Sequence, residues 1–381
     1  MNILYCGPYF SELAIRQKPS ISQAGVRWSL GLVNALRALG HNVDVISHCT
    51  EQMWPWGKVF LQNADLKWFY DSQCRRISYP NLPGIRDLWV NASYARQVEI
   101  ACKKMKFDAF LCYNTIVPYH IAAMKTARSM GVKCYPIILD GADPNKDNWK
   151  QMLANNQYAN GVVFLSHWLM ENYPAGIVRG GSIPVYHLDG GSDAFYGEPP
   201  VAWPECHRFT VAHTGSLNPN RELAFIAKML KAYKDIDTRF VFTGKIDREM
   251  VMSTIDNDSR VEVIGMVGSD ELNRICADAD AFISARAPSI VDFPSKLPNY
   301  LSWGRPVVST WVESFSPDYR DVLFVADGNA PEGMAAQLEV VKRLSLQQRM
   351  DVYDRISTWF KTKKTWGAQA TGLVKWLEGM A

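Results

Sequence analysis

Short apolar runs and amphipathic stretches alternate along most of the chain, and a polar or glycine-containing turn follows almost every run. An apolar run of this kind is typical of a strand in a parallel sheet, because helices cover both faces of such a sheet. The expected strands of the first half are residues 2–6, 43–47, 109–113, 133–139, 161–165 and, near its end, 183–187. Those of the second half are residues 209–214, 238–243, 261–265, 281–285, 306–310 and 322–325. The same α/β pattern therefore occurs twice.

Residues 197–206, GEPPVAWPEC, separate the two halves; they are rich in proline and lack periodicity, as linkers do. We therefore predict an N-terminal Rossmann-like domain at residues 1–197 and a second one at 198–355. A C-terminal helix at 356–381 is expected to pack back on the first domain. A length of 381 residues suits two such domains. Two parallel sheets would form a ligand-binding cleft at the carboxyl ends of their strands.

The overall charge is close to neutral, with 41 Lys and Arg against 38 Asp and Glu. This balance does not favour a nucleic-acid-binding protein, whose affinity depends on a basic face. The eight cysteines lack the spacing of a zinc or redox site, and several lie in apolar runs, which predicts free thiols in a reducing cytosol. No run reaches the ~20 apolar residues of a membrane span. We expect a cytoplasmic protein, with peripheral contact at the inner face of the cell membrane left open.

The stretch from Cys49 to Leu88 departs from the α/β pattern. Its aromatic and basic residues are Trp54, Trp56, Lys58, Phe60, Lys67, Trp68, Phe69, Tyr70, Arg75, Arg76, Tyr79 and Arg86. Aromatic rings beside cations suit a sugar face, a lipid phosphate or a membrane surface. They would equally suit a loop folded into a small satellite core, and both interpretations stay open.

The stretch DFPSKLPNYLSWGRPVVST, residues 292–310, predicts a short helix followed by a strand. Ser295 suits the N-cap of this helix, Gly304 suits the position past its end, and Pro306 prevents its continuation. A helix start with Ser295 and Lys296 beside it attracts anions such as phosphate. The alternative is that Ser295 is a cap alone and Lys296 is a solvated surface residue.

Several stretches occur in a recognisable order. They are AGVRWSLGLVNALRALGHNVDVIS (24–47), YHLDGGSDAF (186–195), HTGSLNPNRELAFIAKML (213–230), FVFTGK (240–245), VEVIGMVGSDELNRICADADAFISA (261–285) and the stretch at 292–310. Each signal is weak alone, but together they resemble the retaining glycosyltransferases of the GT-B fold, in the family 4 group, along nearly the whole chain. The resemblance implies two Rossmann-like domains that face a central cleft.

The resemblance also implies an activity. Such an enzyme would transfer a hexose-type sugar from a UDP- or GDP-type donor to a hydroxyl of a saccharide or lipid-linked acceptor, with retention of configuration. The expected context is bacterial surface polysaccharide or glycoconjugate synthesis. A nucleotide-sugar epimerase, or a catalytically silent subunit that binds sugar nucleotides, are the alternatives with the same fold. An NAD-dependent oxidoreductase is disfavoured, because no G-x-G-x-x-G follows a predicted strand.

The family's functional positions are carried over residue by residue. The catalytic candidates are Asp140, Arg221 and Lys296. The donor-binding candidates are Gly25, Val26, Gly215, Ser216, Lys245, Val267, Asp292, Ser295, Leu297 and Asn299. A diphosphate leaving group gains negative charge as the sugar–oxygen bond breaks, so cations and helix N-termini should converge on it.

The first domain is expected to contribute the acceptor side. Gly25 and Val26, in the turn before the first helix, match the loop that approaches the diphosphate and sugar. Asp140 ends a strand beside the expected position of the reacting carbon, although an Asx-turn would explain it nearly as well. Tyr113 and Asn114 end another strand that faces the cleft.

Some positions depart from the family pattern. Many members carry a pair of glutamates where this chain has Val291 and Asn299, and the first Arg of the phosphate-binding pair is replaced by Ser216. Asp292 is a candidate to replace the first glutamate, and Asn299 can still bond a ribose hydroxyl. These departures leave the donor open, more than the reaction type.

No metal site is predicted. Residues 278–280, Asp-Ala-Asp, resemble the metal-binding DxD of another glycosyltransferase fold, but they lie between a predicted helix and a buried strand. His120 follows Pro118 at a predicted helix start, which suggests a surface residue. The expected partners are a nucleotide-sugar donor and a saccharide or lipid-linked acceptor.

Overall fold

The computed structural model describes residues 1–17, 21–49, 51–61, 66–71, 74–114, 118–139, 156–172, 183–217, 222–286 and 293–380. The chain forms two compact units. Unit 1 comprises Met1–Gly190 together with Trp366–Ala381, and unit 2 comprises Gly191–Thr365. The chain thus leaves unit 1 before the expected linker at 197–206 and returns to it after Thr365.

Unit 1 is built on a parallel sheet with the strand order β4-β2-β1-β6-β7-β8-β9. Its strands are β1 (Asn2–Cys6), β2 (Asn42–Ser47), β4 (Arg75–Arg76), β6 (Ala109–Tyr113), β7 (Lys133–Ile138), β8 (Val162–Phe164) and β9 (Val185–His187). Its helices include α1 (Glu12–Gln17), α2 (Gln23–Ala38), α3 (Arg86–Lys104), α4 (Pro118–Ser129), α6 (His167–Asn172) and α13 (Trp366–Gly379), with 3-10 turns η1 (Leu66–Trp68) and η2 (Asn156–Tyr158). A short antiparallel pair, β3 (Phe60–Leu61) and β5 (Tyr79–Pro80), is separate from this sheet.

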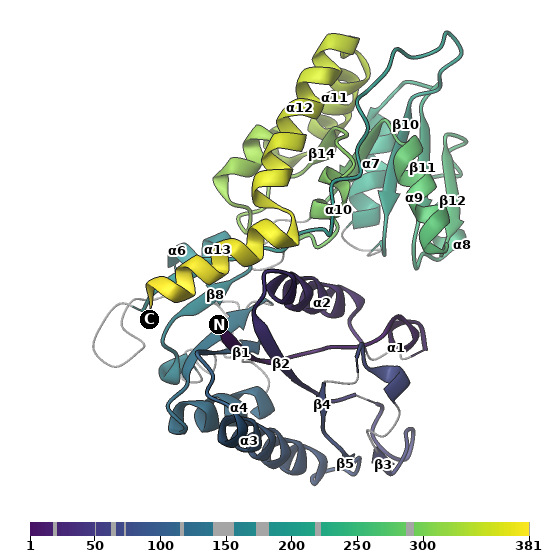
Figure 1. The fold of residues 1–381 in the computed structure, drawn as a ribbon. Coiled ribbons are helices and arrows are strands. Elements are labelled where there is room, and N and C mark those ends of the chain that lie inside the picture. The colour runs from purple at the N-terminus through teal and green to yellow at the C-terminus, as the bar shows by residue number, and fades with distance from the viewer. Residues whose placement is uncertain are drawn as a thin grey trace. The chain divides into compact units, whose positions relative to one another are not determined.

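Alternate residues of the unit 1 strands face opposite layers of helices. Leu4 and Cys6 belong to a buried cluster that Tyr94 of α3 and Met124 of α4 complete. Tyr5, between them, faces α2, where its hydroxyl donates to Ser29 Oγ at 2.6 Å. Helices α2 and α13 pack on each other, and α3 packs on α4 (Figure 1). The apolar runs are continuous because the strands are buried on both faces.

Unit 2 contains a second parallel sheet, with the strand order β12-β11-β10-β13-β14-β15. Its strands are β10 (Thr210–Thr214), β11 (Arg239–Thr243), β12 (Val261–Gly265), β13 (Ala281–Ser284), β14 (Val307–Ser309) and β15 (Leu323–Val325). Its helices include α7 (Ala224–Ala232), α8 (Arg248–Thr254), α9 (Ser269–Asp278), α10 (Leu297–Leu301), α11 (Pro331–Lys342) and α12 (Leu346–Lys363), with 3-10 turns η4 (Pro317–Asp321) and η5 (Asp327–Asn329). Helices α7 and α11 cover one core cluster of this sheet.

The predicted α/β fold with two Rossmann-like parallel sheets is confirmed. Every predicted strand is present; β1, β6 and β12 have the predicted bounds, and the others differ by one or two residues at their ends. The pattern did not predict β3, β4 and β5, because strands of two residues are too short to show a period. Part of the aromatic stretch is buried: Phe69 is 3% exposed, and Tyr79 belongs to the same core cluster as Leu4 and Cys6, so Tyr79 packs in the main core of unit 1 and not in a separate satellite core.

The C-terminal region divides between the units instead of forming one helix. Helix α12 ends at Lys363 in unit 2, and α13 begins at Trp366 in unit 1. Between them, the ammonium of buried Lys364 lies 4.6 Å from the ring centroid of Tyr319. Trp366 packs edge-on against Trp28 of α2, with 5.7 Å between ring centroids. Aromatic packing thus anchors the chain on both sides of the helix break.

We predict that Gly31→Ala destabilises the protein. A Cβ at Gly31 in α2 would lie 2.1 Å from the indole of Trp366, so the extra methyl group would overpack the contact with α13. Such overpacking costs about 1–3 kcal/mol in the free energy of unfolding. Gly367→Ala is the matched control, because a Cβ there meets nothing within 4 Å and alanine favours the helix. Urea denaturation should show a loss for Gly31→Ala alone; equal midpoints would contradict the packing described.

Candidate functional site

The turns after β10 and β11 touch through their backbones, and two glycines permit this contact. Gly215 follows β10 with a φ of +100°, and its N–H donates to the carbonyl of Thr243 at 2.8 Å. Gly244 has a φ of +137°, and a Cβ there would lie 2.4 Å from the carbonyl oxygen of Gly215. A side chain at Gly244 would therefore displace the backbone. Gly215 and Ser216 are exposed at the carboxyl end of the sheet.

The ammonium of Lys296 lies beside the first of these turns. Lys296 comes directly before α10, and its Nζ is 3.1 Å from Nε2 of His213 in β10. A Cβ added to Gly215 would lie 3.8 Å from the same Nζ. The structure therefore brings together two residues that the sequence singled out, Gly215 and Lys296.

Tyr300 holds α10 in this position. Its hydroxyl accepts a hydrogen bond from the N–H of Thr214 at 2.8 Å and donates one to the carbonyl of the same residue at 3.0 Å. Its ring stacks on Phe282 of β13, with 4.6 Å between the ring centroids. Burial raises the pKa of Tyr300, so the hydroxyl keeps its proton. The N–H of Tyr300 donates to the carbonyl of Lys296, which fixes the lysine one helical turn away.

An ion pair that the sequence did not predict lies next to Lys296. Nη1 of Arg286, just past β13, is 3.0 Å from Oε1 of Glu222, whose side chain is 6% exposed. The hydroxyl of Thr310 accepts from the N–H of Arg286 and donates to its carbonyl, both at 2.9 Å. The available sequence signal was weak: a charged residue at the end of an apolar run, and a glutamate shortly after a glycine turn.

Burial controls the protonation of Lys296 and His213. Burial lowers the pKa of Lys296 to about 8; Glu222 opposes this shift and Arg286 adds to it. Burial, followed by the charge of Lys296, lowers the pKa of His213 well below its ordinary value, so the imidazole is neutral. Nδ1 of His213 is 3.3 Å from the carbonyl of Ile283, which can only accept, and this leaves Nε2 to accept from Lys296.

The remaining donor-binding candidates of unit 2 lie in or next to these turns. Lys245 follows Gly244 and is exposed, and Asn299 is exposed on α10. Val267 is partly exposed in the turn after β12. Asp140, Arg221 and Asp292 lie outside the described residues.

The start of α10 differs from the prediction. The helix begins at Leu297, with Lys296 in the capping position, and no side chain caps it, so the prediction that Ser295 is the N-cap is wrong. The N–H of Leu297 donates to the carbonyl of Pro294 at 2.9 Å, and its side chain is fully buried. That N–H is therefore already bonded, and the charged group at this helix start is the ammonium of Lys296.

In unit 1, Gly25 and Val26 lie in the first turn of α2, not in a turn before it. The helix begins earlier than predicted because Ser22 caps it, and Ser22 Oγ accepts from the N–H of Gly25 at 3.2 Å. Val26 is fully buried in the core. A Cβ at Gly25 would lie 2.3 Å from the hydroxyl of Tyr113, so glycine permits the phenol to lie over this helix start.

His120 is buried and not at the surface, which corrects the sequence interpretation. Its Nδ1 is 3.3 Å from the carbonyl of Asn114, and its ring packs edge-on against Tyr94 and Tyr119. Burial lowers the pKa of His120 to about 4, so the imidazole is neutral. These contacts indicate a core histidine.

The DxD-like residues have a structural role. Asp278 ends α9, and Asp280 accepts hydrogen bonds from the N–H of Thr210 at 2.8 Å and from Nε2 of His207 at 2.9 Å. Within the described ranges, no group of three or more His, Cys, Asp or Glu is arranged to hold a metal ion.

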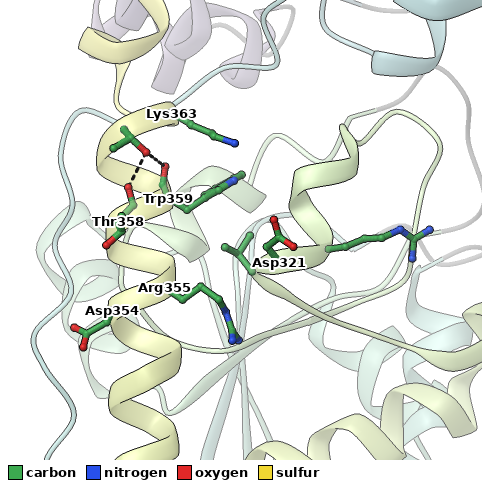
Figure 2. A pocket seen from close by; sticks show the side chains of 9 residues that line it. Asp321, Asp354, Arg355, Thr358, Trp359 and Lys363 are labelled. Carbon is green, nitrogen blue, oxygen red and sulfur yellow. Dashed lines mark hydrogen bonds between the residues drawn. The ribbon is translucent and has the colours of Figure 1, made fainter.

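An open groove of about 860 Å³ in unit 2 lies elsewhere (Figure 2). Asp321 and Val322, which line it, come directly before β15, so the groove lies at the amino end of that strand, whereas the Lys296 site lies at carboxyl ends. Its lining mixes both signs of charge, since it includes Arg355 and Lys363 as well as Asp321 and Asp354. We do not assign it to the reaction, because ligands of such sheets bind at the carboxyl ends of the strands.

Solved structures with this fold cover the whole chain. A glycosyltransferase from Rickettsia africae ESF-5 matches with a TM-score of 0.71 and 14% identity, over 100% of this chain and 98% of that one. HepE from Anabaena in complex with UDP matches with a TM-score of 0.68 and 12% identity, over 100% of both chains. The apo form of the lipopolysaccharide outer core galactosyltransferase WaaB matches with a TM-score of 0.67 and 14% identity, again over 100% of both. Identities this low show a common fold alone.

The family match by sequence falls within unit 2, which holds Lys296. No curated protein sequence matches the chain significantly. Residues 208–342 match the family described as "Glycosyl transferases group 1". This range contains both glycine turns, the Glu222–Arg286 ion pair and α10. Residues 208–342 are therefore similar to the glycosyl transferases group 1 family, which supports a transferase enzyme, and the whole chain has the GT-B fold of the glycosyltransferase structures that it matches.

Proposed function

We propose that the protein transfers a hexose-type sugar from a nucleoside diphosphate donor, of UDP or GDP type, to a hydroxyl of a saccharide or lipid-linked acceptor. The observation that carries this proposal is the convergence of Lys296 on the Gly215 turn at the carboxyl end of β10. A partly buried ammonium beside an exposed glycine turn suits a diphosphate. The structures of HepE with UDP and with UDP-glucose support a nucleotide-sugar donor.

The transfer proceeds with retention of configuration, as in the family 4 group. The bond between the anomeric carbon and the diphosphate oxygen breaks, the electron pair passes to the diphosphate, and Lys296 stabilises the added charge. The acceptor hydroxyl forms the new bond on the same face and gives its proton to a phosphate oxygen. Asp140 and Arg221, assigned from the family resemblance, orient the sugar and bind the diphosphate. The expected context is bacterial surface polysaccharide or glycoconjugate synthesis.

The proposal is tested by screening UDP- and GDP-sugars for thermal stabilisation, then assaying release of the nucleoside diphosphate with and without acceptor. Ligands that bind the folded state raise its melting temperature. Stabilisation with turnover supports the transferase. Stabilisation by a donor that is never cleaved would favour a silent binding subunit.

A membrane contact is proposed for the side of unit 1 that β3, β5 and the start of α3 form. Its exposed apolar residues are Trp54, Trp56, Val59, Phe60, Ile85, Leu88 and Trp89. Asn81, directly after β5, joins this strand to the segment before β3. Its Nδ2 donates to the carbonyls of Gln52 at 2.6 Å and Lys58 at 3.0 Å. Tryptophan prefers the membrane interface, and a lysine beside it can reach lipid phosphates. Such a contact suits a lipid-linked acceptor.

We predict that Lys296→Ala lowers kcat/KM by roughly 10- to 160-fold, because a lost charged hydrogen bond costs about 1.5–3 kcal/mol. The lysine must be protonated to act, and its pKa is about 8, so wild-type kcat/KM should fall as pH rises through that value. Lys296→Arg should abolish this alkaline decline, because a guanidinium stays charged. Exposed Lys234→Ala is the control. An unchanged kcat/KM in Lys296→Ala would exclude the assigned role.

We also predict that catalysis needs no divalent metal, because protein cations already stabilise the leaving group. Turnover measured in the presence of EDTA should match that of the untreated enzyme. Activity that is lost with EDTA and restored by Mn²⁺ or Mg²⁺ would overturn this proposal.

For the membrane contact, Trp56→Ser combined with Leu88→Ser should reduce co-sedimentation with vesicles of neutral and anionic phospholipid. The side chains of Trp56 and Leu88 are 81% and 72% exposed, so their replacement removes apolar surface without opening the core. Ile236→Ser is the control, because Ile236 is 77% exposed in unit 2. Equal sedimentation of all three proteins would rule the contact out.

A further inference from the structure

The Glu222–Arg286 ion pair is held in place more firmly than an ordinary surface pair. Glu222 is almost completely buried, and the side chain of Arg286 is 32% exposed. The hydroxyl of Thr310 bonds both backbone groups of Arg286. Nε of Arg286 is buried and finds no hydrogen-bond partner among the described residues. A guanidinium that the ion pair restricts and that is still partly exposed is suited to bind an anion that enters beside it.

The ion pair belongs to the same electrostatic site as Lys296. Among the described residues, the charged or titratable groups that face Lys296 are His213 of β10, Glu222 before α7 and Arg286 after β13. His213 is neutral, so two positive charges and one negative charge remain. The charges of these described residues therefore sum to about one, although two of them are cations.

Two cations in a partly desolvated site destabilise each other. Arg286 and burial both favour loss of the proton from Lys296, and Glu222 is the group that opposes them. Removing one member of a buried ion pair also leaves the other charge uncompensated. Glu222 thus opposes the loss of the proton from Lys296 and compensates the charge of Arg286.

We propose that Glu222 is a positioning residue that keeps Arg286 in place and Lys296 charged before the donor binds, so that both cations meet the diphosphate of the donor. This inference rests on the proposed function. It adds Arg286 as a cation that binds diphosphate, in a site whose first turn carries Ser216 and not a basic residue. The alternative is that Glu222 merely repels the diphosphate, in which case its removal should tighten binding.

The two alternatives predict opposite effects of Glu222→Gln at high pH. The experiment measures the affinity of UDP and GDP by calorimetry at pH 6 and pH 8.5, for the wild type, Glu222→Gln, Glu222→Asp, Arg286→Gln and Arg286→Lys. Arg286→Gln should weaken binding about tenfold or more at both pH values. Arg286→Lys should recover part of this loss, because the charge is kept.

At pH 6, where Lys296 is protonated without help, Glu222→Gln should lose only the part of the affinity that depends on the position of Arg286. At pH 8.5 it should bind more weakly than the wild type by about tenfold, because its lysine deprotonates at a lower pH. Glu222→Asp should restore part of the affinity at pH 8.5. If Glu222 had a purely structural role, its replacement would weaken binding equally at both pH values. The pH dependence therefore separates a structural role from an electrostatic one.

Glu262→Gln is the matched control, because Glu262 pairs with Arg239 at 2.5 Å on the surface of the same unit and its side chain is 52% exposed. It should bind as the wild type does. If the wild type binds neither UDP nor GDP, the proposed function fails and this inference fails with it. If the wild type binds, then tighter or unchanged binding of Glu222→Gln at pH 8.5, or unchanged binding of Arg286→Gln, overturns the inference alone.

Discussion

The hydroxyl of Tyr300 bonds both backbone groups of Thr214 at the end of β10, and the arrangement of the site depends on this contact. Helix α10 spans only Leu297–Leu301. A helix this short is not stable by itself and needs tertiary contacts to fix its position. The tyrosine fastens it to the central strand of the sheet, and its stack on Phe282 fixes the ring. Lys296, one turn earlier, is thereby held beside the Gly215 turn.

Nearby groups offset the cost of partly burying the ammonium of Lys296. A buried ammonium loses hydration, and without compensation it would give up its proton. The neutral imidazole of His213 accepts a hydrogen bond from Lys296, and Glu222 supplies negative charge close to both cations. Because the cations are already partly desolvated, the diphosphate of the proposed donor would meet stronger electrostatic interactions here than on an open surface.

Much of the fold was predictable, and less of the site. The apolar runs predicted the sheets, and Gly304 was expected past the end of α10, where its φ of +64° suits glycine. The predicted cap at Ser295 was wrong, because the carbonyl of Pro294 bonds the N–H of Leu297 and the helix starts later. His120 was assigned to the surface because its immediate neighbours give no sign of Tyr94, which covers it. Each error concerns a side chain or N–H whose partner is supplied by the fold.

By itself, the sequence determined the two parallel sheets, the glycine turn at Gly215 and the short helix that ends before Gly304. These features depend on residues close together in the chain, and their periods and backbone preferences are local. The tertiary structure alone decided which charges meet. His213 and Lys296 are 83 residues apart, and Glu222 and Arg286 lie on different connections of the sheet. They meet because β10 lies between β11 and β13, so that the carboxyl ends of strands distant in sequence share one edge.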